Sequence, residues 1–495
     1  MHYMHRNKNA QREMEKIMGN IFYKPENAWV GDLIPYYENG TYFAFYLHDP
    51  RNRKDEFAED TTWHLVTTKN FLDLTYHGEA IHPGGADKPD RNAYTGSVIR
   101  DDNGICYAFF TAFNEDIKID GKSVQSVMRA KGTDPYHLET DREFLFAADD
   151  KIYESFDWRD PYVFFHEKEQ CWWMLLAARR KNTGGLRGGC IALCKSKDLT
   201  NWTYEQPFFD PHMYVTMECP EVFQMGNYWY LVFSTFNEKF VTHYRIADSL
   251  EGPWRIPDDD VFDTRANYAI KTVSDGNRRF ACGWIASKKG NCDFGPWEWG
   301  GTMVFHEVIQ NPENGELHIK QIDAYGRFYQ EKVETSNPIL WNCRMEEKTV
   351  KTEMLGAFLY DVPKDAFSLE MQFEILKAHE FGIALHASDG LETGYFLKMN
   401  DRTGEMAWDQ WPRAVPGKYQ WQIKGDIPYQ LETVRRLPTG PVYRVKILRE
   451  GSICIVYVND EVALSTRMYD HNGQLAGLFL VQGAAKFTKF ELKIR

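Results

Sequence analysis

The stretch Glu38-Asn-Gly-Thr-Tyr-Phe-Ala-Phe-Tyr46 decides the fold, because a polar Asn-Gly pair leads directly into a run of strand-forming aromatic residues. Asn-Gly and Asp-Gly between strand-like runs are strong signals for a β-hairpin. The same arrangement, a polar turn followed by aromatic residues, recurs four more times, at 102–110, 166–176, 225–233 and 274–284. The first two thirds of the chain therefore repeat one hairpin unit five times.

A second element follows four of these five hairpins. It consists of a small-residue strand, a polar turn and an aromatic residue, and it occupies 65–76, 127–136, 191–202 and 244–254. Each unit is thus about four strands long, and a radial repeat of four-stranded units is typical of a β-propeller. A large irregular β-sandwich is the alternative. We predict an all-β protein in which residues 25–322 form a five-bladed β-propeller.

The remaining segments differ in pattern from the repeat. Residues 1–24 are polar and are expected to form a helical or extended arm that lacks the apolar core of a signal peptide. Residues 323–339 are polar and read as a linker. From 340 to 495 the chain alternates apolar and polar residues in strand-length runs, as in Phe367-Ser-Leu-Glu-Met-Gln-Phe-Glu-Ile375, which predicts a separate β-sandwich.

Composition excludes several classes of function. The 495 residues carry 58 Lys+Arg and 71 Asp+Glu, a net charge of −13, without any basic cluster, which argues against nucleic-acid and membrane partners. The nine cysteines contain no CxxC pair, so we expect buried free thiols and a cytoplasmic protein. Aromatic residues make up 15% of the chain and supply many rings for binding flat or ring-shaped ligands. The sequence leaves the oligomeric state open.

Acidic residues recur at one position of the repeat. The first strand of each propeller blade lines the central axis, so equivalent positions on these strands meet in a ring. Counting back eight residues from each hairpin turn gives Asp32, Gly96, Asp160, Glu218 and Tyr268. Converging carboxylates repel each other, so one should hold a proton near neutral pH while another stays ionised, as glycoside hydrolysis requires. The alternative is that these acids start strands by chance or cap loops.

Two of these acids lie in recognisable motifs. Trp158-Arg-Asp-Pro161 and Glu218-Cys-Pro220 resemble the Arg-Asp-Pro and Glu-Cys motifs of glycoside hydrolase family 32, which contains invertases, inulinases and levanases. Tyr94-Thr-Gly-Ser-Val98, the stretch 262–272 and the stretch 299–307 resemble further segments of that family, in the same order. The likeness spans about residues 25 to 495, and the family fold, a five-bladed propeller with a β-sandwich, agrees with the repeat.

The resemblance implies a role for each acid. Asp32 would be the nucleophile, Asp160 would stabilise the transition state with Arg159 beside it, and Glu218 would be the general acid/base. The implied reaction is a double displacement with retention on a small fructofuranoside-type oligosaccharide, with sugar transfer as a further activity. The sequence also lacks Gly-x-Gly-x-x-Gly, P-loop and His-Glu-x-x-His motifs, so it implies no metal and no nucleotide cofactor.

The first motif departs from the family pattern. Gly31 stands where the family has asparagine before the nucleophile, and Leu47 stands where the family has a glutamine that contacts sugar. A site that loses hydrogen-bond partners usually loses the hydroxyls that needed them. We therefore expect an atypical member that acts on an unusual fructoside or another furanoside.

Further sugar-binding residues are expected near the acids. Aromatic rings in this region can stack on sugar C–H faces, although packing between blades is the alternative for each of them. An isolated histidine could instead make a structural hydrogen bond. The candidates besides Arg159 are Trp63, Tyr94, Thr95, Trp158, Tyr268, Trp284, Trp299 and His48.

Two other functions remain open at this point. The first is an inverting furanosidase like glycoside hydrolase family 43, although Cys219 after Glu218 favours family 32, since the other family has glycine there. The second is a non-catalytic carbohydrate-binding pseudoenzyme, which the altered first motif suggests and the intact acidic trio argues against.

Overall fold

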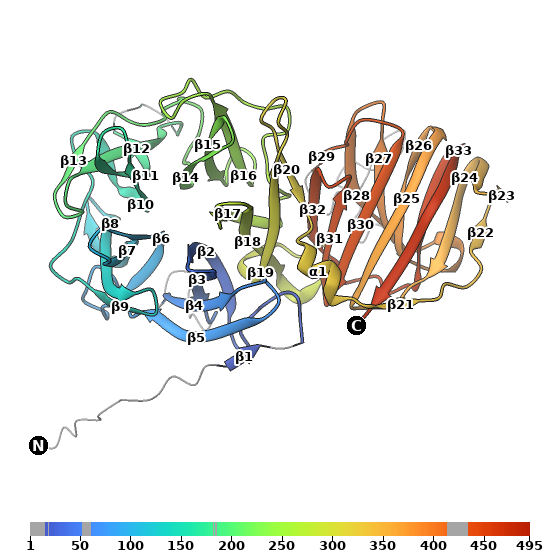
Figure 1. Ribbon diagram of the computed structural model, residues 1–495, viewed down its shortest axis with the longest axis horizontal. Helices are drawn as coiled ribbons and strands as arrows, with labels where there is room; N and C mark the ends of the chain where they lie inside the picture. The colour runs from blue at the N-terminus through green and yellow to red at the C-terminus, as the bar shows by residue number, and fades with distance from the viewer. Residues whose placement is uncertain (1–14, 18, 52–60, 182, 184–185, 413–433) are drawn as a thin grey trace, which may run out of the picture.

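The computed structural model describes residues 15–17, 19–51, 61–181, 183, 186–412 and 434–495. Most of the predicted arm, residues 1–14 and 18, lies outside this range; what is described of it includes strand β1 (Glu15–Ile17). The chain forms a five-bladed β-propeller followed by a β-sandwich, which confirms the predicted fold class (Figure 1). The blades surround a common axis, with β2, β6, β10, β14 and β17 innermost.

Each blade is an antiparallel sheet built from consecutive strands. Blade one consists of β2 (Trp29–Glu38), β3 (Thr41–Asp49), β4 (Thr62–Thr68) and β5 (Leu74–Ile81), with β1 added to β5. Blade two consists of β6 (Asn92–Arg100), β7 (Cys106–Ile119), β8 (Lys122–Asp134) and β9 (His137–Thr140). Blade three consists of β10 (Tyr153–His166), β11 (Cys171–Arg180), β12 (Gly189–Ser196) and β13 (Trp202–Tyr204). Blade four consists of β14 (Glu218–Met225), β15 (Tyr228–Thr235) and β16 (Val241–Ala247), and blade five of β17 (Asn267–Ser274), β18 (Arg279–Lys288), β19 (Trp297–Gln310) and β20 (Leu317–Lys320).

The predicted hairpin turns join the first two strands of every blade. In blade one, Glu38 pairs with Thr41, which leaves a two-residue turn with φ of 50° at Asn39 and 78° at Gly40. Positive φ at both central residues is the requirement of the tight hairpin turn that matches strand twist, and Asn-Gly meets it. The Asn-Gly pair that predicts the hairpin from the sequence is therefore the pair whose positive φ angles form the turn.

Blade four differs from the predicted four-stranded unit. Among the described residues it has three strands, and its outer edge is joined only by isolated bridges from Ile246 to Arg255 and from His243 to Val261. This outer segment contains Pro253 and Pro257, which lack the N–H group that a continuous ladder needs. The prediction of four strands is wrong for this blade.

The propeller closes where its first and last blades meet. Gly301 of β19 pairs with Val30 of β2, so blades one and five share one continuous sheet. One buried apolar cluster extends across blades one, four and five and includes Val30, Tyr46, Val232 and Trp284. The strand that carries Asp32 is thereby fixed against the last blade.

The C-terminal part is a second all-β unit with its own apolar core. The long strand β33 (Leu475–Ile494) lies at its centre and pairs with β21, β24, β25 and β26. Its other strands are β21 (Glu331–Val333), β22 (Ile339–Trp341), β23 (Arg344–Glu346), β24 (Thr349–Asp361), β25 (Phe367–Lys377), β26 (Glu380–Ala387), β27 (Gly394–Asn400), β28 (Glu405–Trp411), β29 (Arg435–Arg436), β30 (Val442–Glu450), β31 (Ile453–Val458) and β32 (Val462–Arg467).

Short elements connect these units. The segment 323–339, predicted as a linker, contains helix α1 (Asp323–Phe328) and strand β21, and β21 pairs with β33 of the sandwich. Two 3-10 turns, Lys289–Asn291 and Asp389–Leu391, complete the described secondary structure.

All nine cysteines are free, and seven of them are buried, as predicted. In the described part of the chain, no helix has the length and apolarity to cross a membrane.

Candidate active site

A break in strand register marks the same place in all five inner strands. The breaks lie between Val30 and Leu33, Tyr94 and Gly96, Arg159 and Tyr162, Glu218 and Glu221, and Tyr268 and Lys271. An extra residue in one strand leaves the ladder unpaired there and redirects side chains. Asp32, Asp160 and Glu218 all lie within or at the edge of these bulges. The same bulge, repeated in each inner strand, therefore turns side chains toward the propeller axis.

Asp32 is held by hydrogen bonds from two other strands. The Thr95 hydroxyl donates to Oδ2 at 2.5 Å, and Trp284 Nε1 donates to Oδ1 at 3.0 Å. Since an indole N–H can only donate, it fixes Oδ1 as an acceptor. The Asp32 carboxylate is therefore fixed in direction by blades two and five.

Cys219 connects Asp32 with the other two acids. Its thiol lies 3.8 Å from Asp32 Oδ2, its backbone N–H donates to Asp160 Oδ2 at 2.9 Å, and it directly follows Glu218. Asp160 and Cys219 have φ of 58° and 51°, a region that side chains other than glycine rarely adopt. Backbone of this kind occurs at sites where the surrounding structure imposes a special geometry.

Glu218 is positioned by an arginine and a tyrosine. Arg159 Nη2 donates to Oε1 at 3.0 Å, and the Tyr268 hydroxyl donates to Oε2 at 2.7 Å. Arg159 is itself bound to Asp157 and lies 3.9 Å from Asp160 Oδ2. The Glu218 side chain is 22% exposed, against 6% for Asp160, so Glu218 is the more accessible of these two acids.

Crowding and burial make these acids electrostatically unusual. Burial, together with repulsion from Asp160 and Glu218, raises the pKa of Asp32 to about 7, although the Thr95 and Trp284 hydrogen bonds oppose the rise. Burial also raises the pKa of Glu218, with Asp160 adding to the rise and Arg159 opposing it. Burial and mutual repulsion therefore disfavour the state in which both carboxyls are ionised.

Two of the predicted sugar-stacking residues are corrected by the structure. Trp63 and Trp158 are both 0% exposed. Trp63 packs on Phe45 and Phe110 inside the propeller, and Trp158 packs on Tyr153. Their rings fill the apolar core of the propeller and are closed to a sugar.

Other predicted binding residues act on the acids or lie beside them. Thr95 and Tyr268 are buried and bind Asp32 and Glu218 respectively, so they position acids where sugar contacts were expected. Tyr94 is half-buried and stacks on Phe113, with ring centroids 5.5 Å apart. His48 of β3 stacks on His64 of β4, with ring centroids 3.9 Å apart, and pairs across the sheet with Val30. Trp299 is 37% exposed and lies 5.7 Å from the ring of Trp284.

Two residues contribute to the candidate site in ways that the sequence alone does not predict. Cys219 was seen only as part of a motif, and its contacts to two acids depend on the bulge in β14. Phe240 stacks on Tyr268 with ring centroids 4.2 Å apart, although it comes from the loop before β16. No local pattern marks Phe240, so only the fold could identify it.

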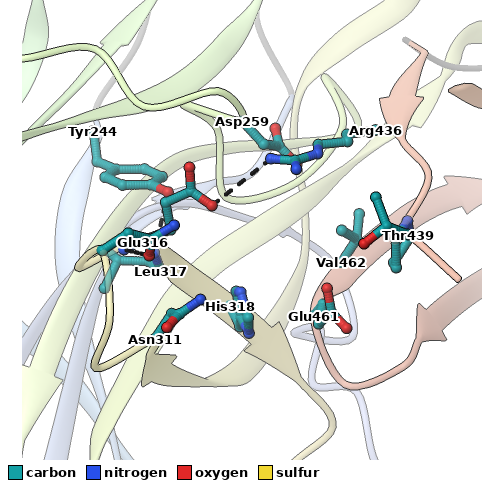
Figure 2. Close-up of a pocket in the computed structure, with 12 residues that line it drawn as sticks. Tyr244, Asp259, Asn311, Glu316, Leu317, His318, Arg436, Thr439, Glu461 and Val462 are labelled. Atoms are coloured by element: carbon teal, nitrogen blue, oxygen red, sulfur yellow. Dashed lines mark hydrogen bonds and ion pairs between the residues drawn. The ribbon is translucent and has the colours of Figure 1, made fainter. Parts of the chain in front are cut away.

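A cavity of about 280 Å³ lies elsewhere, between the propeller and the sandwich (Figure 2). Tyr244, Glu316 and His318 line it from the propeller, and Arg436 and Thr439 line it from the sandwich. Arg436 forms an ion pair with Glu316 at 3.7 Å. The lining includes none of the three acids, so this cavity is separate from the candidate active site.

Comparisons with known proteins identify the family to which this chain belongs. The model of the glycosyl hydrolases family 32 N-terminal domain matches residues 22–320. Over the full length, the chain is 28% identical to raffinose invertase of Escherichia coli, covering 97% of both chains. It is 23% identical to sucrose-6-phosphate hydrolase of Escherichia coli, covering 94% of this chain and 93% of that one.

Solved structures share the fold at lower identity. Fructan 1-exohydrolase IIa from Cichorium intybus has a TM-score of 0.71 at 15% identity, covering 98% of this chain and 97% of that one. Exo-inulinase from Aspergillus awamori has a TM-score of 0.69 at 16% identity, covering 95% and 96%. Since the family model matches more than half of the chain, this protein is a glycoside hydrolase that belongs to glycosyl hydrolase family 32.

Proposed function

We propose that this protein is a retaining glycosidase that cleaves a fructofuranoside-type, or related furanoside, oligosaccharide by double displacement. The observation that carries the proposal is the set of contacts around Cys219, which brings Asp32 and Asp160 together beside Glu218. A nucleophile, a stabilising carboxylate and a general acid within one hydrogen-bonded cluster are the groups that this reaction needs.

In the first step, the Asp32 carboxylate attacks the anomeric carbon of the bound sugar. Glu218 donates its proton to the glycosidic oxygen as the bond to the leaving group breaks, so the leaving sugar departs as a neutral alcohol. The product of this step is a covalent ester between the sugar and Asp32. Asp160 accepts hydrogen bonds from sugar hydroxyls and stabilises the positive charge that develops on the ring.

In the second step, water replaces the leaving group. Glu218, now ionised, takes a proton from the water as its oxygen attacks the anomeric carbon, and the ester bond to Asp32 breaks. Two inversions at the same carbon give net retention. The Arg159 and Tyr268 hydrogen bonds hold Glu218 in one orientation through both of its roles.

The substrate class follows from the relatives and from the altered first motif. Names such as raffinose invertase and sucrose-6-phosphate hydrolase describe relatives that act on short fructosides. Gly31 and Leu47 provide no polar side chain at the two positions discussed above. We therefore place the substrate among small furanosides other than the usual sucrose or inulin.

A substrate screen with product analysis tests the proposal. The purified protein is incubated with sucrose, raffinose, sucrose-6-phosphate, inulin, aryl fructofuranosides, aryl arabinofuranosides and cyclic difructose sugars, and the first-formed anomer is followed by NMR. We expect cleavage of at least one furanoside with retention, and its loss in Asp32→Asn. Initial inversion would instead support the family-43-like mechanism, and tight sugar binding without turnover would support a pseudoenzyme.

A further inference from the structure

The indole of Trp299 occupies the space beside Gly31, the residue that precedes the proposed nucleophile. A Cβ atom at position 31 would overlap Cη2 of Trp299 and would lie 2.7 Å from its Cζ2. Real side chains do not approach so closely, so no residue larger than glycine fits at position 31 unless the Trp299 ring moves. Glycine at position 31 therefore leaves the space that the Trp299 indole fills.

The backbone gives no separate reason for glycine at this position. Gly31 is not among the residues of this chain with positive φ, whereas Gly40 and Gly78 are. Glycine is needed conformationally only in that left-handed region. The contact with the indole therefore accounts for Gly31, although these two residues are 268 positions apart in the chain.

Arg51 fixes the segment that carries Trp299. Its Nη2 donates to the backbone oxygens of Trp299 and Gly300, each at 2.8 Å, and its Nη1 donates to Glu298 Oε2 at 2.9 Å. The guanidinium also lies over the Trp29 ring, 4.0 Å from its centroid. Several hydrogen bonds from one planar group restrict the backbone on both sides of the indole, so the ring is held against Gly31.

Trp299 is linked to the proposed nucleophile through Trp284. The ring is packed near Trp284, whose Nε1 binds Asp32, and the residue is 37% exposed. Gly31 directly precedes Asp32 in the chain, and the indole occupies the space into which a side chain at position 31 would project. An aromatic face packs well against C–H groups, but it leaves a buried hydroxyl without a strong partner.

We propose that Trp299 is a specificity-determining residue. Its indole contacts the reacting furanose and favours a furanose that turns a C–H face toward the ring. This inference rests on the proposed glycosidase function. It assigns the substrate preference to packing: the furanosyl unit that is accepted turns a ring face with few hydroxyls toward Trp299. A pocket built to bind a hydroxyl discriminates strongly, whereas an apolar wall discriminates by shape and by the cost of an unpaired polar group.

The test compares two aryl glycosides that share one leaving group. The probes are p-nitrophenyl β-D-fructofuranoside and p-nitrophenyl α-L-arabinofuranoside, so any change in their ratio of kcat/KM reports on the furanosyl unit alone. The variants are Trp299→Ala, Trp299→Phe and the double variant Gly31→Asn/Trp299→Ala. Trp411→Ala, at an exposed tryptophan of the sandwich that is 46% exposed, is the matched control.

Loss of the ring should weaken binding of the sugar. We expect Trp299→Ala to lower kcat/KM on the better probe by about 10–100-fold, mainly through KM, and Trp299→Phe to stay within about fivefold. The double variant should shift the ratio toward the hydroxyl-richer fructofuranoside by about tenfold, since the asparagine fills the space with a hydrogen-bonding group. Melting temperatures measured alongside separate these effects from unfolding.

Each outcome bears on a different claim. Unchanged rates and an unchanged probe ratio in folded Trp299→Ala, with an active wild type, would overturn the role of Trp299 and leave the glycosidase proposal standing. A wild type that cleaves neither probe nor any glycoside of the screen would contradict the proposed function, and the inference would fail with it. Equal losses on both probes in every Trp299 variant would show a structural role only.

Discussion

At the scale of single residues, the site contains two buried acids, Asp32 and Glu218, whose ionised forms repel each other. Burial raises the pKa of both Asp32 and Glu218, while two neutral donors hold Asp32 and a charged arginine holds Glu218. Protonation of either carboxyl relieves repulsion on the other, so full ionisation of both is disfavoured. The proposed division of labour needs a proton on Glu218 when the sugar is bound.

Glu218→Gln tests this division of labour through the leaving group. Glutamine keeps the shape of the side chain but cannot donate the proton, which matters only when the leaving group is a poor one. We expect kcat/KM to fall by about 10³-fold or more on an alkyl or sugar glycoside and by about tenfold on the aryl glycoside. Glu169→Gln, at an exposed acid of the β10–β11 turn, serves as the control. Equal losses on both substrates would argue against the acid assignment.

Asp32→Asn should stabilise the folded protein in a pH-dependent way. Because the pKa of Asp32 rises from 3.8 to about 7 on folding, the folded state binds the proton more tightly, and stability falls as the pH rises between these values. Asparagine does not titrate in this range, so the variant does not lose this stability as the pH rises. The melting temperature of Asp32→Asn relative to wild type should therefore increase by about 2 °C or more from pH 4 to pH 8.

The control for this experiment is Asp87→Asn, since Asp87 has a side chain that is 82% exposed. Its melting temperature relative to wild type should not change between the two pH values. An Asp32→Asn curve that runs parallel to wild type would contradict the raised pKa of Asp32. Activity should be lost in this variant at every pH.

At the scale of strands, the hairpins were predictable and the bulges were not. Asn39-Gly40 and its four counterparts fixed the turns and the strand order, because turn chemistry is local. Counting back from those turns found Asp32, Asp160 and Glu218, whose common surroundings depend on bulges at matching positions. The burial of Trp63 and the contact between Gly31 and Trp299 could not be predicted, since both depend on which strands become neighbours.

Gly301→Ala tests the close packing of β19 on β18, at the residue where β19 also pairs with β2. A Cβ atom there would overlap the carbonyl oxygen of Ile285 and lie 2.9 Å from the Cα of Ala286, both of which belong to backbone. We expect the free energy of unfolding to fall by about 1–3 kcal/mol in urea titrations. In the control Gly326→Ala, the new methyl has Gln321 Nε2 at 3.4 Å as its nearest neighbour, so the loss should be small. Equal stability of both variants would contradict the close packing of β19 on β18 at Gly301.

At the scale of the whole molecule, the sandwich is joined to blade five by buried polar contacts. Asp263 accepts hydrogen bonds from the backbone N–H of Ser465 at 2.8 Å and from its hydroxyl at 2.5 Å. Arg467 donates to the backbone oxygens of Ile285 and Ala286 at 2.8 and 2.7 Å. Breaking a buried pair on one side is costly because the other partner stays buried and unpaired.

The two units should therefore unfold together. We expect one transition by calorimetry for the wild type, and a loss of about 3 kcal/mol in the free energy of unfolding for Asp263→Ala. Hydrogen bonds and His306 lower the pKa of Asp263 to about 2, despite opposing desolvation, so its contribution is present above pH 4 and disappears as the pH falls toward 2. Two separated transitions in the wild type would contradict this coupling.

The central claim is that Asp32 forms a covalent bond to the sugar while Glu218 supplies and removes the proton. Mass spectrometry tests it most directly, using Glu218→Gln mixed with p-nitrophenyl β-D-fructofuranoside and quenched rapidly in acid, because the activated leaving group still departs while the second step is slow. The account predicts one added sugar on the peptide that contains Asp32, and none in Asp32→Asn/Glu218→Gln. Release of p-nitrophenol without an adduct on that peptide, or an adduct on another residue, would contradict it.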